Sequence, residues 1–248
     1  MKILVCISHV PDTTSKINFT DGDTKFDTQG VQFVINPNDE FGLTRAMWLK
    51  EKQGASIDVI NVGNSSSEPT LRKALAIGAD KAIRIDADPL DGYFVAKQIS
   101  EYVKTSSYDL IIAGRESIDY NGAMVPGLIA GFLKINYVTN CTKLEIDNEK
   151  VELDREIDGG KETLNCTLPL IIGGQKGLVE EKDLRIPNMR GIMTARTKVL
   201  TILEPVGGDS KTATVKFEKP APKSAVKLVS ADNLDELISL LHNEAKVI

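Results

Sequence analysis

Residues 109–122 read DLIIAGRESIDYNG, an apolar segment of strand length that runs directly into a loop rich in glycine and polar side chains. A short apolar run of this kind is typical of a strand buried on both faces, as in a parallel sheet. Similar runs occur at 2–8, 57–62, 82–86 and 169–173, and segments of helical periodicity separate several of them. We therefore predict an α/β fold, with an open, mostly parallel, Rossmann-like sheet and helices on both faces.

Four helices are predicted between these strands, and two inserted hairpins interrupt the pattern. The helices cover 39–53, 69–78, 90–104 and 123–133, and their apolar stripes indicate core packing. The hairpins cover 17–35, with Asp21-Gly22 as the turn, and 143–167, around Asp158-Gly159-Gly160.

The composition changes after residue 204, so we divide the chain into an α/β domain, 1–204, and a C-terminal arm, 205–248. Proline and glycine punctuate the arm on either side of a short expected strand at 209–218. A final helix, near 232–243, carries an exposed apolar stripe. The stripe alone leaves open whether this arm folds back or binds another chain, and we interpret the arm and its helix as an element for subunit association. The stripe consists of Leu234, Leu237, Ile238 and Leu241.

Charge and composition exclude several classes of protein. The 248 residues carry a net charge of −5 with interspersed signs, which argues against a nucleic-acid surface. No apolar run reaches the roughly 18 residues of a membrane span, and the first residues do not resemble a secretory signal, so we expect a soluble, cytoplasmic protein without membrane insertion. Three scattered cysteines and two histidines form neither a disulfide framework nor a metal site. Neither the usual dinucleotide signature nor the P-loop signature is present.

Three polar loops that follow apolar runs are the candidate ligand site. They are 36–39, 63–67 and 114–122. In an open parallel sheet, ligands bind beyond the carboxyl ends of the strands, where the strand order reverses and helix N-termini offer N–H groups to a phosphate. Each loop alone is compatible with an ordinary surface turn. The three together favour a nucleotide-sized ligand.

Six further motifs appear in a characteristic order. They are KILVCI (2–7), NPNDE (36–40), LAIGAD (75–80), GRESID (114–119), REIDGG (155–160) and LRIPNMRGIMTAR (184–196). With them the chain resembles the β (small) subunit of electron-transfer flavoproteins over essentially its whole length. The resemblance implies an adenine-nucleotide-binding domain that holds AMP, and a heterodimer whose α subunit holds most of one FAD.

The same resemblance implies a role in electron transfer without bond-making chemistry, so we expect a carrier subunit and not an enzyme. The heterodimer would accept electrons from acyl-CoA and other flavin dehydrogenases. It would pass them through a membrane-bound flavoprotein–quinone oxidoreductase towards the quinone pool. The expected compartment is the cytoplasm of a bacterium or the mitochondrial matrix of a eukaryote.

The resemblance also assigns expected roles to individual residues of this chain that match positions in the family motifs. Thr13 stands where an aromatic side chain often lies against the flavin, and Glu156 matches a carboxylate that contacts the flavin domain. Met189, in a projecting partner-recognition loop at 178–194, matches a leucine that anchors the dehydrogenase. A phosphate in such a loop is held by backbone N–H groups without a lysine. The implied AMP-binding residues are Cys6, Asn36, Pro37, Asn38, Asp39, Asn64, Gly114, Arg115, Glu116, Ser117, Ile118, Asp119, Tyr120, Asn121, Gly122, Ala123, Met124 and Val125.

Departures from the family pattern keep alternatives open. Met124 lies in the part of the loop where the family commonly has a glutamine, and a thioether cannot replace the hydrogen bonds of an amide. Some members bifurcate electrons and hold a second FAD in place of AMP. A stand-alone nucleotide-binding regulatory module is another alternative. An ATP-hydrolysing or adenylating enzyme is disfavoured, because residues 9–12 read HVPD where such enzymes have a glycine-serine loop.

Overall fold

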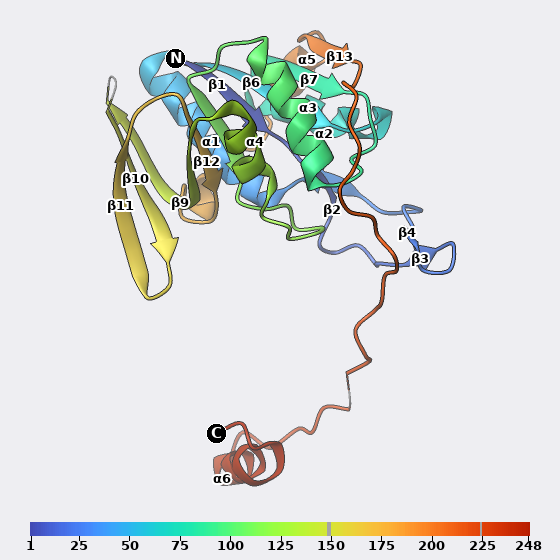
Figure 1. Ribbon diagram of the computed structural model, residues 1–248. Coiled ribbons are helices and arrows are strands. Elements are labelled where there is room, and N and C mark those ends of the chain that lie inside the picture. Colours follow the sequence, from blue (N-terminus) through green and yellow to red (C-terminus); the bar gives the residue numbers. More distant parts are fainter. Residues whose placement is uncertain (148–149, 224) are drawn as a thin grey trace.

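The computed structural model describes residues 1–147, 150–223 and 225–248, and a nine-stranded sheet forms its centre (Figure 1). All neighbouring pairs from β9 to β13 are parallel, and β10 and β11 extend the edge beside β9 in antiparallel fashion. This confirms the predicted open, mostly parallel α/β sheet. The strand order is β11 (Gly160–Cys166), β10 (Lys150–Ile157), β9 (Asn136–Asp147), β12 (Leu170–Gly174), β8 (Leu110–Gly114), β1 (Lys2–Cys6), β6 (Ser56–Val62), β7 (Lys81–Ile85) and β13 (Leu200–Leu203).

Helices cover both faces of the sheet, as predicted. Along β1, Ile3 belongs to the core under α1 (Pro37–Gln53) and α2 (Glu68–Ile77), whereas Leu4 belongs to the core under α3 (Gly92–Lys104) and α4 (Val125–Leu133). Successive side chains of a strand point to opposite faces, so one apolar run supplies both cores. A shorter helix, α5 (Met189–Ala195), lies against α2.

The expected insertions are present but are placed differently in the fold. Asp21 and Gly22 form the turn between β3 (Phe19–Thr20) and β4 (Lys25–Phe26), both with positive φ. Around them, β2 (His9–Pro11) pairs with β5 (Phe33–Ile35) as a second small ribbon. The hairpin at 143–167 is not separate from the core, since β9 carries it into the main sheet. Neither β9 before residue 143 nor β13 was expected.

The first half of the arm lies against the α/β domain. Gln98 of α3 and Val206 exchange two hydrogen bonds of 2.8 Å, and Phe217 stacks on Phe19 with ring centroids 4.8 Å apart. The prediction of a strand at 209–218 is wrong, because this segment follows the domain surface through side-chain and single backbone contacts and pairs with no strand. The arm therefore begins as a strap on its own domain.

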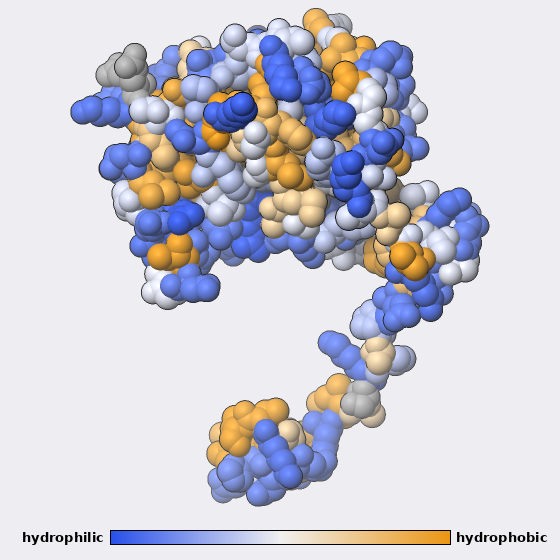
Figure 2. Space-filling model, in the orientation of Figure 1, coloured by the Kyte–Doolittle hydropathy of each residue, from blue (hydrophilic) through white to orange (hydrophobic). Residues whose placement is uncertain are grey.

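The second half of the arm extends away from the domain and ends in α6 (Leu234–Ser239), which continues as the π-helical turn η3 (Leu240–Ala245) (Figure 1). The apolar side chains of the predicted stripe are largely uncovered: Leu234 is 61% and Ile238 56% exposed. Figure 2 shows this hydrophobic surface at the far end of the arm. No helix among the described residues is long and apolar enough to cross a membrane.

Candidate functional site

The strand order reverses between β1 and β8, and a buried carboxylate joins the carboxyl ends of these two strands. Asp39, in the first turn of α1, accepts the N–H of Ser8 on Oδ2 and the N–H of Gly114 on Oδ1, both at 2.7 Å. Its side chain is almost completely buried, and this burial raises the pKa of the carboxyl to about 7 against the effect of its hydrogen bonds. Two of the three predicted loops are thus tied together by one side chain.

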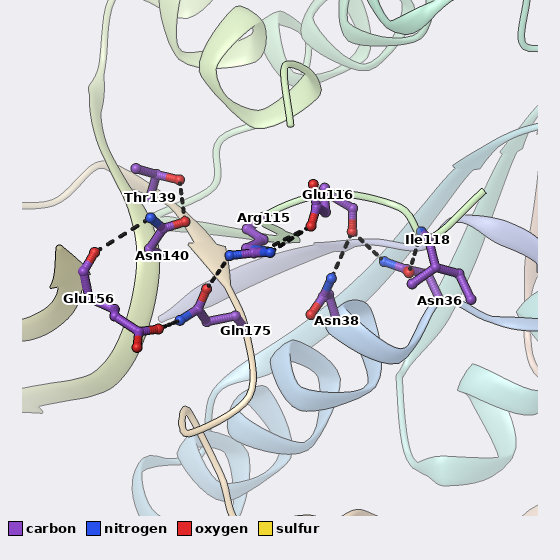
Figure 3. Close-up of polar contacts among 9 residues, drawn as sticks. All are labelled: Asn36, Asn38, Arg115, Glu116, Ile118, Thr139, Asn140, Glu156 and Gln175. Carbon is purple, nitrogen blue, oxygen red and sulfur yellow. Dashed lines mark hydrogen bonds and ion pairs between the residues drawn. The ribbon is translucent and has the colours of Figure 1, made fainter. Parts of the chain in front are cut away.

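Two asparagines that precede Asp39 in the chain bind the backbone of the loop after β8 (Figure 3). The Nδ2 groups of Asn36 and Asn38 both donate to the carbonyl oxygen of Glu116 at 3.0 Å. Asn36 also accepts the N–H of Ile118 on Oδ1 at 3.2 Å. Because these bonds run to backbone groups, they fix the path of the loop after β8 whatever side chains it carries.

Gly114, at the end of β8, permits this close approach. A Cβ atom at this position would lie 2.5 Å from Oδ1 of Asp39 and 2.7 Å from Cβ of Asn38, which is well inside van der Waals contact. The close approach of these α1 and N-cap side chains explains why a glycine ends the strand.

Further along, the loop turns back on itself just before α4. Asn121 and Ala123 both have φ of 48°, and Met124 has φ −104° and ψ −28°, so a left-handed residue precedes a right-handed one. An alternation of this kind is the backbone conformation in which successive N–H groups can converge on an anion, and residues 121–124 are called the nest below. In the described part of the chain, the N–H groups of residues 122–125 donate to no protein acceptor. A left-handed alanine is strained, and strain of this kind is common at functional sites.

Arg115 is not available to such an anion. Its Nε and Nη2 donate to Oε1 of Glu116 at 3.1 and 2.7 Å, and its Nη1 donates to Gln175 at 3.1 Å. The charge of the guanidinium is therefore balanced within the protein, and a phosphate at the nest would depend on the backbone and on the N-terminus of α4.

The geometry agrees with what comparison with known proteins finds. Residues 23–206 match the family model described as "Electron transfer flavoprotein domain". The chain belongs to the electron transfer flavoprotein family. It is 36% identical over 262 aligned positions to "Electron transfer flavoprotein subunit beta" of Bacillus subtilis (strain 168), with complete coverage of both chains. It is 34% identical to the same-named subunit of Syntrophomonas wolfei, covering 91% of this chain and 88% of that one. A relative named "Electron transfer flavoprotein subunit beta, mitochondrial", from Oryza sativa subsp. indica, is 34% identical over the full length of both chains.

The resemblance to the β subunit is thereby confirmed. Within this electron transfer flavoprotein chain, Cys6 ends β1 and is buried, and burial together with the carboxylate of Asp39 raises the pKa of its thiol. The thiol therefore stays protonated. Asn64 lies at the same edge, after β6, where its Oδ1 caps a short 3-10 helix, Ser65–Ser67, by accepting the N–H of Ser66 at 3.0 Å.

Two apolar or aromatic side chains of the predicted loop, Tyr120 and Met124, are exposed to different degrees. Tyr120 is 68% exposed, and Met124 packs against α3, where a Cβ atom on Gly92 would lie 2.7 Å from its sulfur. Met124 thus contacts α3 through its thioether. Among the described residues, no cluster of three metal-ligating side chains occurs.

Three predicted residues lie outside this cluster. Thr13 is an exposed residue in the segment that follows β2. Glu156 lies on β10, and its Oε2 accepts a hydrogen bond from Nε2 of Gln175 at 2.5 Å. Met189 begins α5 and is 74% exposed, so the segment predicted as a projecting loop is partly helical. Gly191 belongs to this helix and not to a loop tip, since a Cβ atom there would lie 2.2 Å from the carbonyl oxygen of Ala76 on α2.

Two residues that contribute to the site were not predicted, Ser8 and Gln175. Both follow directly on apolar strands at the carboxyl edge of the sheet, Ser8 after β1 and Gln175 after β12. That position was the signal in the sequence, but neither residue belongs to a recognisable motif.

Proposed function

We propose that this chain is the β subunit of a heterodimeric electron transfer flavoprotein that binds AMP at the nest formed by residues 121–124. In this proposal FAD is held mainly by the α subunit. The pair carries electrons from acyl-CoA and related flavin dehydrogenases through a membrane-bound flavoprotein–quinone oxidoreductase towards the quinone pool. The observation that carries the proposal is the group of unpaired N–H groups before α4, at the strand switch point of a chain of this family.

AMP fits this place on chemical grounds. Its phosphate is a dianion that converging N–H groups and a helix N-terminus bind without a lysine. Asn36, Asn38 and Asp39 hold the backbone of the loop at Glu116 and Gly114, and the residues that would meet the phosphate, 121–124, follow this anchored part. The ligand supplies no redox chemistry in this role. It stabilises the loop, and the chain itself acts as a carrier subunit and not as an enzyme.

The α subunit is proposed as the partner of the projecting arm. Leu234, Leu237 and Ile238 leave an apolar stripe uncovered on α6. Burying three or four such side chains contributes roughly 5–10 kcal/mol before the cost of ordering the arm. A helix of this kind needs a groove on another chain, and a heterodimer supplies one.

The dehydrogenases are proposed to dock on α5. Met189 and Met193 are 74% and 66% exposed, and Ile186 just before the helix is 85% exposed. Methionine side chains adapt to differently shaped pockets, which suits a surface that meets several donors. The family resemblance singles out Met189 as the anchor. Donor and carrier would meet in the bacterial cytoplasm or the mitochondrial matrix.

Purification of the chain alone and with its α subunit tests the proposal. We expect a colourless single chain that releases AMP on denaturation, identified by mass spectrometry, and a yellow one-to-one complex with one FAD. One tightly bound FAD on the isolated chain would refute the AMP proposal and would indicate the second flavin of an electron-bifurcating protein. A chain that binds nucleotide but no larger partner would be a stand-alone regulatory module.

A further inference from the structure

A continuous line of polar contacts connects the first part of the loop after β8 with Glu156 on β10, and Gln175 stands in its middle (Figure 3). Gln175 is 6% exposed. Its Nε2 donates a hydrogen bond to Oε2 of Glu156 at 2.5 Å, and its Oε1 accepts a hydrogen bond from Nη1 of Arg115 at 3.1 Å. A guanidinium only donates and a carboxylate only accepts, so the amide has a single orientation that satisfies both neighbours.

On the loop side, the contacts lead back to the switch point. The N–H of Arg115 donates to the carbonyl oxygen of Gly174 at 2.8 Å, and its guanidinium holds the carboxylate of Glu116. The carbonyl oxygen of Glu116 is in turn the acceptor of Asn36 and Asn38. A shift of the loop after β8 therefore moves the group to which Gln175 is bonded.

On the hairpin side, the contacts end at an exposed residue. In the described part of the chain, the Glu156 carboxylate has no cationic group within 4 Å. Lys161 on β11 is the residue paired with Glu156 in the strand register, but the two side chains form no ion pair. An exposed glutamate is ordinarily free to rotate. Here the buried amide of Gln175 holds it in one place on the surface.

We propose that Gln175 is a positioning residue that couples occupation of the nest to the position of the Glu156 carboxylate. The inference rests on the proposed function for the presence of AMP at the nest. AMP draws the N–H groups of residues 122–125 towards its phosphate and so restrains the loop that carries Arg115 and Glu116. Coupling between two sites is reciprocal, so Glu156 must affect the affinity for AMP by the same factor.

A double-mutant cycle on the full chain, with AMP as the titrant in calorimetry, tests the coupling. Glu156→Ala is expected to weaken AMP binding about fivefold in the otherwise unchanged chain. In a chain that also carries Gln175→Met, Glu156→Ala is expected to have no effect. Glu156→Gln retains an acceptor and should restore most of the affinity. Asp158→Ala, on the same hairpin, is the matched control and should leave the affinity unchanged.

The sign of the effect separates the coupling from plain electrostatics. Removing the negative charge of Glu156 strengthens the binding of an anion because a long-range repulsion is lost, whereas loss of the coupling weakens it. Equal effects of Glu156→Ala in both backgrounds, or a gain in affinity, would overturn the proposal. If Gln175→Met does not fold, Gln175→Glu takes its place, because it retains the contact with Arg115 and repels Glu156.

A measurement without ligand distinguishes this inference from the proposed function. In nuclear magnetic resonance spectra, Glu156→Ala should shift the Nε–H signal of Arg115, and it should not do so when Gln175→Met is present. A chain that binds no AMP refutes the nucleotide proposal and the nest end of the coupling. The absence of a shift at Arg115 refutes the role of Gln175 even if AMP binds.

Discussion

Gly114→Ala tests whether the close approach of α1 to β8 holds the candidate site together. The new Cβ would lie 2.5 Å from a buried oxygen of Asp39 and 2.9 Å from Nδ2 of Asn36, about 1 Å closer than ordinary contact. Overpacking of this kind costs about 1–3 kcal/mol. The displaced carboxylate also loses a hydrogen bond to Gly114 or Ser8, which adds about 1.5–3 kcal/mol. We expect the free energy of unfolding to fall by about 3 kcal/mol.

Urea denaturation and thermal melting measure this loss, and calorimetric titration with AMP measures its effect on the site. A chain of this size loses about 2–4 °C in Tm per kcal/mol, so a fall of about 6–12 °C is expected, with at least tenfold weaker AMP binding. Gly131→Ala is the matched control, since nothing lies within 4 Å of a Cβ there and alanine favours the helix. If Gly114→Ala unfolds within about 0.5 kcal/mol of the original chain and binds AMP equally well, the asparagine and aspartate contacts do not define the site.

Four further outcomes are expected. Met189→Ala should weaken flavin reduction by a donor dehydrogenase about thirtyfold at low donor concentration, or about 2 kcal/mol, with an unchanged melting curve, and Met189→Leu should restore it. Because burial raises the pKa of Asp39 to about 7, the folded state holds a proton that the unfolded state releases above about pH 4. The free energy of unfolding should therefore fall by up to about 1.4 kcal/mol per unit as the pH rises from 5 to 7, and Asp39→Asn should remove this slope in urea titrations at each pH. Ala123→Gly relieves a left-handed alanine and should raise the free energy of unfolding by about 1 kcal/mol without loss of AMP affinity, as measured by calorimetry. Deletion of 220–248 should abolish association with the α subunit in size-exclusion chromatography, while a melting temperature close to that of the intact chain would show that the domain persists.

The central strands and the four long helices could be predicted because their signals are local. Apolar runs mark β1, β6, β7, β8 and β12, and Gly54 marks the end of α1, although this helix begins at Pro37, two residues before the expected start. The meeting of the candidate loops could also be predicted, since the carboxyl ends of parallel strands lie at one edge of the sheet.

Elements that depend on distant partners could not be predicted. β13 is short and its Ile202 is half exposed at the sheet edge, so its pairing with β7 leaves no periodic pattern. α5 forms because Gly191 lets it lie on α2, which no local propensity reveals. The contact of Asp39 with Gly114 spans 75 positions of the chain. The motifs named both residues, but nothing in them indicated that one accepts a hydrogen bond from the other.

The stacking of Phe217 on Phe19 divides the arm into a fixed part and a tether. From that stack, residues 218–233 can span at most about 53–58 Å before α6 begins. Once a partner touches the domain anywhere within this radius, α6 is present at an effective concentration set by the tether, commonly in the millimolar range. Association then becomes a two-step capture in which a weak first encounter is made lasting by a second, intramolecular one. The lifetime of the complex, more than the rate of its formation, would be governed by the position of the Phe19–Phe217 stack.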